Sequence, residues 1–212
     1  MAGSGSAGGE GKEAIGVDVG TFLNGVSAAD LVIVLYFLGF FVLGFAQGTI
    51  RRLLGIGSIL FSFLFAANVA EPLGNFLGTN WTQFPREYSY MIGFATIFLA
   101  SSLAFALVVQ GFYKPQPLFQ RARFADEIIG GLLGLVQAAL IFGAVLVILD
   151  TFFRIPGIPV NSNELPVLRD LWGAMDGSKF AAPFRETLIP GFFLLVGLFI
   201  PDKIEQSYPL GG

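Results

Sequence analysis

The sequence predicts an all-α membrane protein with four transmembrane helices, followed by short interfacial helices near the C-terminus. Of its 212 residues, 54% are hydrophobic and only 13% are charged, and the mean hydropathy is +0.73. These values lie outside the range of ordinary soluble domains. Four stretches without an ionisable side chain also reach or approach the roughly 20 helical residues that cross a hydrocarbon core of about 30 Å. Length and composition therefore place most of the chain in a membrane.

Residues 1–29 form a glycine-rich, acidic N-terminal tail that we expect to be flexible. The tail carries Glu10, Glu13 and Asp18 against a single Lys12. Because it lacks the basic start of a secretory signal peptide, we expect no cleavage, and the first span should act as its own signal.

The four-helix transmembrane domain is expected over residues 30–155. The uncharged stretches are 31–50, 53–70, 88–113 and 128–149, and all are rich in leucine, phenylalanine, alanine and glycine. A continuous helix over the first two would be about 60 Å long, so the chain must turn between them, at Arg51 and Arg52. Glycines on both sides of the arginines favour a tight reversal, and a re-entrant half-helix is the alternative.

Residues 156–212 form a less apolar, proline-containing segment that cannot be one long helix. We predict short helices over 166–175 and 178–189, lying on the membrane surface. The side chains expected to face the membrane are Leu168, Leu171, Trp172, Phe180 and Phe184. Pro190 and Gly191 interrupt the uncharged stretch 187–201, which reads as interfacial or re-entrant, with a fifth span as a minority alternative.

The distribution of basic residues predicts that both termini lie outside the cytoplasm. Lysines and arginines near spans favour the cytoplasmic side of a membrane. Placing the first and third loops inside collects five of them, namely Arg51, Arg52, Lys114, Arg121 and Arg123. The opposite side holds four over a longer stretch, namely Lys12, Arg86, Arg154 and Arg169.

Composition removes most enzyme chemistry. The chain has no histidine and no cysteine, so it lacks the usual ligands of haem, iron–sulfur clusters and zinc, and the thiol nucleophile. We expect no cofactor, no metal and no catalytic residue. The net charge of -3 argues against nucleic acid as a partner. Ser178 beside Lys179 could form a serine–lysine pair, but a helix start at Ser178 is the simpler interpretation.

Polar and small residues inside the spans are better candidates for a role. Gln47 and Gln137 are intramembrane amides, and Gln137 lies near mid-membrane, where an interhelical hydrogen bond is favoured over substrate binding. Small residues recur at four-residue spacing and predict close helix packing, with phenylalanines expected on the lipid-facing sides. The small-residue stripes include Gly44 with Gly48, Ser58 to Ala70, and Gly130 with Gly134.

Two stretches resemble the colicin V production protein (CvpA) family. Its pattern is an acidic residue, then Gly-Phe-x-Arg-Gly-x-x-Arg-Glu in the first hairpin, and later Asp-x-x-x-Gly-x-x-x-Gly-x-x-Arg-Gly opening the last span. The matching residues are Asp30, Gly44, Phe45, Gly48, Arg51, Asp126, Gly130 and Gly134. The chain departs from the pattern at Gln47 and Gln137, which replace arginines, at Ala138, which replaces glycine, and at Arg52, which replaces glutamate.

The resemblance implies a multi-pass protein of the bacterial inner (plasma) membrane, named for a requirement in toxin export. We interpret the chain as a non-enzymatic scaffold, with membrane lipids and other membrane or extracytoplasmic proteins, such as a protease, as partners. Its oligomeric state stays open. One alternative is an accessory structural subunit of a bioenergetic or photosynthetic complex. The other is a small channel or secretion component, with Arg51, Arg52, Gln47, Gln137 and Asp126 lining a polar vestibule.

Overall fold

The computed structural model describes residues 27–112, 123–155 and 163–196, and every regular element in these ranges is helical. The four long helices are α2 (Ala28–Gln47), α3 (Thr49–Asn80), α4 (Arg86–Phe112) and α5 (Arg123–Phe153). Each is long and apolar enough to cross a membrane, which confirms the predicted four-span fold. The shorter elements are α6 (Pro166–Asp176), α7 (Ala181–Pro183), the π-helical η1 (Phe184–Leu188) and α8 (Ile189–Val196).

The first reversal lies at Gly48, so the predicted turn at the two arginines is wrong. α2 runs unbroken from Ala28 to Gln47, which excludes the re-entrant half-helix over this stretch. Gly48 has a φ of 75°, which glycine adopts without the steric cost that a Cβ brings. α3 begins at the next residue, and Arg51 and Arg52 lie in its first turn.

α3 also continues past the end of its apolar stretch. It contains Pro72 and reaches Asn80, giving 32 residues and a length of about 48 Å, more than a hydrocarbon core of about 30 Å requires. The predicted end at residue 70 is therefore wrong for the helix. Glu71 bounds the uncharged stretch, but a charged residue does not interrupt backbone hydrogen bonding.

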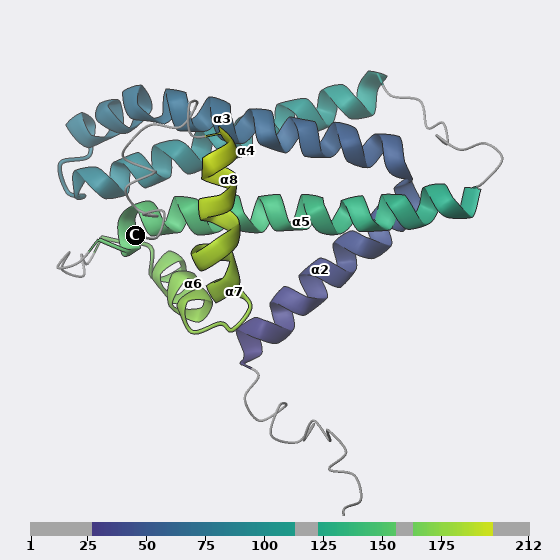
Figure 1. Ribbon diagram of the computed structural model, residues 1–212. Helices are drawn as coiled ribbons and strands as arrows, with labels where there is room; N and C mark the ends of the chain where they lie inside the picture. Colours follow the sequence, from purple (N-terminus) through teal and green to yellow (C-terminus); the bar gives the residue numbers. More distant parts are fainter. Residues whose placement is uncertain (1–26, 113–122, 156–162, 197–212) are drawn as a thin grey trace, which may run out of the picture.

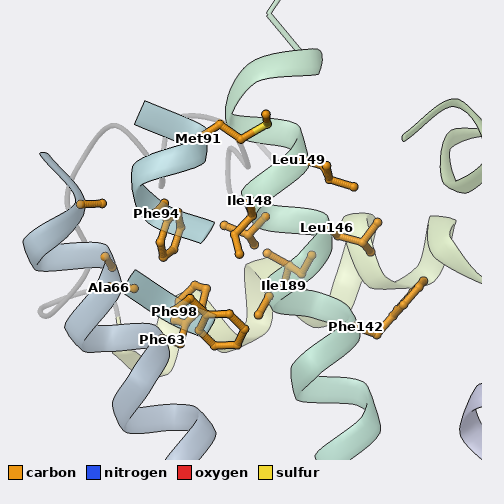
Figure 2. Close-up of a cluster of buried hydrophobic side chains, with 14 of the residues drawn as sticks. Phe63, Ala66, Met91, Phe94, Phe98, Phe142, Leu146, Ile148, Leu149 and Ile189 are labelled. Carbon is orange, nitrogen blue, oxygen red and sulfur yellow. The ribbon is translucent and has the colours of Figure 1, made fainter. Parts of the chain in front are cut away.

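Small residues bring α3 and α4 into close contact. Ala66 and Ala70 are fully buried, and a Cβ on Gly74 would lie 2.9 Å from the Cα atom of Tyr90. In lipid, helix association depends on such packing, because burial from hydrocarbon offers little hydrophobic gain. Figure 2 shows the core beside this contact, where Phe63 and Phe98 lie close together.

α5 is the most buried of the four long helices. In Figure 1 it runs alongside α3 and α4, with α2 set obliquely on its other side. Leu146 and Phe152 on α5 are almost completely buried in the hydrophobic core. α8 crosses in front of α5, and its Ile189 and Phe193 are buried in the same core.

The C-terminal helices differ from their predicted form in two respects. Pro190 and Gly191 do not break the helix but lie inside α8. In the preceding π-turn the Ile189 N–H reaches back to the Phe184 carbonyl, and this wider turn gives room for a proline that has no N–H to donate. Residues 197–201 of the predicted interfacial or re-entrant stretch lie outside the described residues.

The apolar side of this segment packs on protein rather than facing the membrane as predicted. Trp172 stacks on Phe153 with 5.8 Å between ring centroids, and Phe184 lies edge-to-face against Phe142 at 4.9 Å. Leu168 also packs against the core. Leu171 and Phe180, in contrast, are about two-fifths exposed. The segment is therefore part of the bundle's packing.

Candidate functional site

The matched glycines form the crossing of α2 and α5. A Cβ on Gly130 would lie 2.5 Å from the carbonyl oxygen of Gly44, and one on Gly134 would collide with the carbonyl oxygen of Phe40. Both obstacles are backbone atoms, which cannot rotate away. Only glycine at these positions allows the two backbones to approach so closely. The Tyr36 hydroxyl, which donates to the Ala138 carbonyl at 3.0 Å, ties the same two helices together.

Asp126 joins this crossing to the reversal at Gly48. A Cβ on Gly48 would lie 2.6 Å from Oδ2 of Asp126, so the carboxylate sits against the turn. The hydroxyl of Thr49 donates to the Asp126 carbonyl at 3.1 Å. Asp126 lies in the first turn of its own helix, α5. The side chain also faces the N-terminus of α3, whose dipole favours a negative charge.

Gln137 makes an interhelical hydrogen bond with an arginine that the sequence did not pair with it. Nη1 of Arg52 donates to Oε1 of Gln137 at 2.7 Å. Arg52 is only 4% exposed and its guanidinium lies over the Phe40 ring at 5.7 Å from the centroid. Arg52 therefore brings a buried positive charge to the amide of Gln137.

The other predicted polar residues stay apart from this pair. Gln47 and Arg51 are half-buried at the reversal. Asn68 is exposed and donates to the Leu64 carbonyl in its own helix at 2.8 Å. Among the phenylalanines expected to face lipid, Phe61 is exposed as predicted, whereas Phe98 is buried in the core.

A second polar cluster lies at the opposite end of the bundle. We call it the polar clasp and define it by Asp30, Asp150, Trp172, Ser178 and Arg185. Arg185 donates to both carboxylate oxygens of Asp150, from Nη2 at 2.8 Å and from Nε at 2.9 Å. The indole of Trp172 donates to the same carboxylate at 2.8 Å. The side chain of Asp150 is 0% exposed and that of Arg185 is 9% exposed, so this two-bond ion pair is shielded from solvent.

The other half of the polar clasp ties the C-terminal helices to the start of α2. The hydroxyl of Ser178 donates to Oδ1 of Asp30 at 2.6 Å, and it accepts from the backbone N–H groups of Phe180 and Ala181. Asp30 also closes a capping box with Ser27. Ser178 therefore joins the C-terminal helices to the bundle, but α7 begins at Ala181 and not at Ser178 as predicted.

An apolar cavity of about 400 Å³ lies between α3, α5, η1 and α8. Its lining includes Ile59, Phe63, Leu140, Ala144 and Phe184, and Thr187 supplies the sole polar side chain among the described residues around it. The cavity is therefore apolar, and none of the residues predicted to line a polar vestibule lines it.

The chain matches the family model described as Colicin V production protein over residues 29–188. It belongs to the colicin V production protein family. No curated protein and no solved structure matches the chain. The family match covers the glycine crossing, both polar clusters and the C-terminal helices up to the end of η1.

Two departures from the colicin V production pattern meet in space. The pattern has glutamate at position 52 and arginine at position 137, whereas this chain has Arg52 and Gln137, whose side chains bond each other. Relative to the pattern, position 52 on α3 therefore carries a positive instead of a negative charge, and position 137 on α5 is neutral instead of positive. Arg52 consequently has no carboxylate partner among the described residues, because none of the ion pairs there includes it.

The sequence reasoning missed most of the polar clasp. Asp150 and Arg185 were not among the predicted site residues. Ser178 was predicted as a helix start, but its bond to Asp30 spans 148 positions of the chain. An aspartate directly following a span was the available signal, since a charge at a span end needs a partner or water.

Proposed function

We propose that this member of the colicin V production family is a non-enzymatic membrane scaffold that presents its C-terminal helices to other envelope proteins. The observation that carries the proposal is the polar clasp, which attaches the segment 163–196 to the bundle at two places. Ser178 bonds Asp30 at the start of α2, and Arg185 pairs with Asp150 near the end of α5. α6 is held with Trp172 inward, while Val167 on the same helix is 73% exposed. A rigidly held surface of this kind suits recruitment of a partner.

The arrangement of the polar residues favours a scaffold over a channel. Arg52 and Gln137, which would line a polar vestibule, bond each other, and Asp126 lies against the reversal. The described cavity is apolar. We further propose a bacterial inner membrane and an extracytoplasmic position for the polar clasp, on the basis of the basic residues in the first and third loops.

Site-specific photo-crosslinking in cells tests the scaffold. A photoreactive residue at Val167 should capture a discrete protein partner, whereas one at Leu103 on α4, which is 62% exposed, should capture lipid. Arg185→Gln should abolish capture at position 167 without abolishing membrane insertion, because it releases the helices from Asp150.

The same experiment separates the alternatives. Equal capture of protein at positions 103 and 167, with migration of the native protein in a much larger complex, would support the accessory-subunit alternative. Capture at position 167 that is unaffected by Arg185→Gln would contradict the role of the polar clasp. A reporter fused after Gly212 that is active only in the cytoplasm would contradict the orientation.

A further inference from the structure

Arg52 is a buried cation without a compensating charge. Among the described residues its only hydrogen bond goes to the neutral amide of Gln137, and its Nε atom has no partner there although Arg52 is only 4% exposed. A guanidinium has five donors, so most of its hydrogen-bonding capacity is unused. Ionisable side chains in membrane segments are costly and mark ligand sites when they lack a protein partner.

Arg52 lies at the polar end of the apolar stretch of α3. It is the fourth residue of α3, so it lies about 5 Å along the helix axis from the first residue. The apolar stretch of α3 starts at the next residue, Leu53. The helix N-terminus adds a partial positive charge there, and Arg51 adds a full one. The carboxylate of Asp126 sits against Gly48 and forms no ion pair with Arg52.

The apolar cavity begins farther along the same two helices. Ile59, which lines it, follows Arg52 by seven residues, or about 10 Å along α3. On α5, Val136 and Leu140 line the cavity on either side of Gln137. A buried cation at the end of the apolar stretch and an apolar cavity farther along α3 thus share the seam between α3 and α5.

We propose that this seam binds one anionic phospholipid, with an acyl chain in the cavity and the phosphate at Arg52. The apolar lining favours a hydrocarbon chain, which is also what a membrane supplies at this depth. A phosphate oxygen would use donors of Arg52 that Gln137 leaves free and would compensate the buried charge. A free phosphate would satisfy only the arginine.

Native mass spectrometry of the purified full chain in mild detergent tests the proposal. The protein is titrated with phosphatidylglycerol, phosphatidylcholine of matched acyl chains, or inorganic phosphate alone. We expect wild-type protein to prefer phosphatidylglycerol by about tenfold, because both lipids offer a phosphate to Arg52 but the ammonium group of phosphatidylcholine cancels the negative charge that would compensate the buried guanidinium. Arg52→Gln should remove the preference. Arg123→Gln is the matched control, because it removes an exposed charge at the same end of the bundle and should keep the preference.

The acyl-chain part has its own variants. Val136→Trp should fill the cavity mouth and weaken the binding of both lipids, whereas Val108→Trp, at an equally exposed position on α4, should not. Arg52→Lys retains the charge and should retain a preference for phosphatidylglycerol. If Arg52→Gln fails to fold, this variant tests whether the positive charge at position 52 binds the phosphate.

Three results would overturn the proposal. The first is an unchanged lipid preference in Arg52→Gln, or its loss in a folded Arg52→Lys. The second is wild-type lipid binding in Val136→Trp. The third is inorganic phosphate bound as tightly as phosphatidylglycerol, which would make the arginine a site for a free anion.

Discussion

Replacing Gly130 by alanine tests the close crossing of α2 and α5. The added Cβ would lie 2.5 Å from the carbonyl oxygen of Gly44 and 2.9 Å from the Cα atom of Gly48. A comfortable carbon–oxygen contact is about 3.3–3.6 Å, so the two helices must separate by about 1 Å. Both neighbours are backbone atoms, which means that no rotamer change can relieve the clash.

The expected loss follows from two opposing effects. Overpacking a well-fitted contact costs roughly 1–3 kcal/mol, while exchanging glycine for alanine inside a helix regains about 1 kcal/mol. Gly130→Ala should therefore be destabilised by up to roughly 2 kcal/mol, or up to about 8 °C in melting temperature. Gly39→Ala, on α2, meets nothing within 4 Å and should be neutral or slightly stabilised.

Thermal unfolding of both variants in the same detergent, followed by loss of monodisperse protein, measures the difference. The control matters because both substitutions change helix propensity equally, so the gap between them reports the contact of the added Cβ with the backbone of Gly44 and Gly48. A Gly130→Ala protein that melts at or above the temperature of Gly39→Ala would refute the close crossing.

The polar contacts give further predictions. Asp150→Asn should weaken the docking of the C-terminal helices by about 1–3 kcal/mol, because it leaves the buried Arg185 with the exposed Asp176 as its remaining carboxylate partner; amide hydrogen exchange there should accelerate, and unchanged exchange would contradict it. Ser178→Ala should cost about 1–3 kcal/mol, since it leaves Oδ1 of Asp30 without its donor, and limited proteolysis of these helices should quicken. Gln137→Leu should lower the melting temperature by removing a hydrogen bond from a buried guanidinium, at a cost of about 1–3 kcal/mol, and wild-type stability would count against that bond.

The number and approximate place of the spans could be predicted because a membrane restricts the backbone locally. Without water in the hydrocarbon core, each crossing segment must satisfy its own hydrogen bonds as a helix, so uncharged length translates into a span. Helix ends were less well predicted. Glu71 ends the uncharged stretch, but α3 continues through Glu71 and Pro72 to Asn80. The end of an apolar stretch is therefore not the end of a helix.

The small-residue spacing also indicated close packing, although not its partners. The pattern marked Gly44 and Gly130 separately, and the structure shows that each faces the other's backbone. The reversal at Gly48 was misplaced onto the arginines, since composition shows where glycine is frequent but not which glycine adopts a positive φ.

The sequence by itself determined that the chain is a four-span helical protein whose apolar stretches and glycine motifs belong to the colicin V production family. Only the tertiary structure decided which polar groups meet. Arg52 and Gln137 are 85 positions apart, and Asp30 and Ser178 are 148 apart. Such pairs depend on the angle and depth at which two helices cross. Many small contacts across the bundle set that geometry, whereas the pattern of residues along the chain reflects only the local requirement that each span be helical.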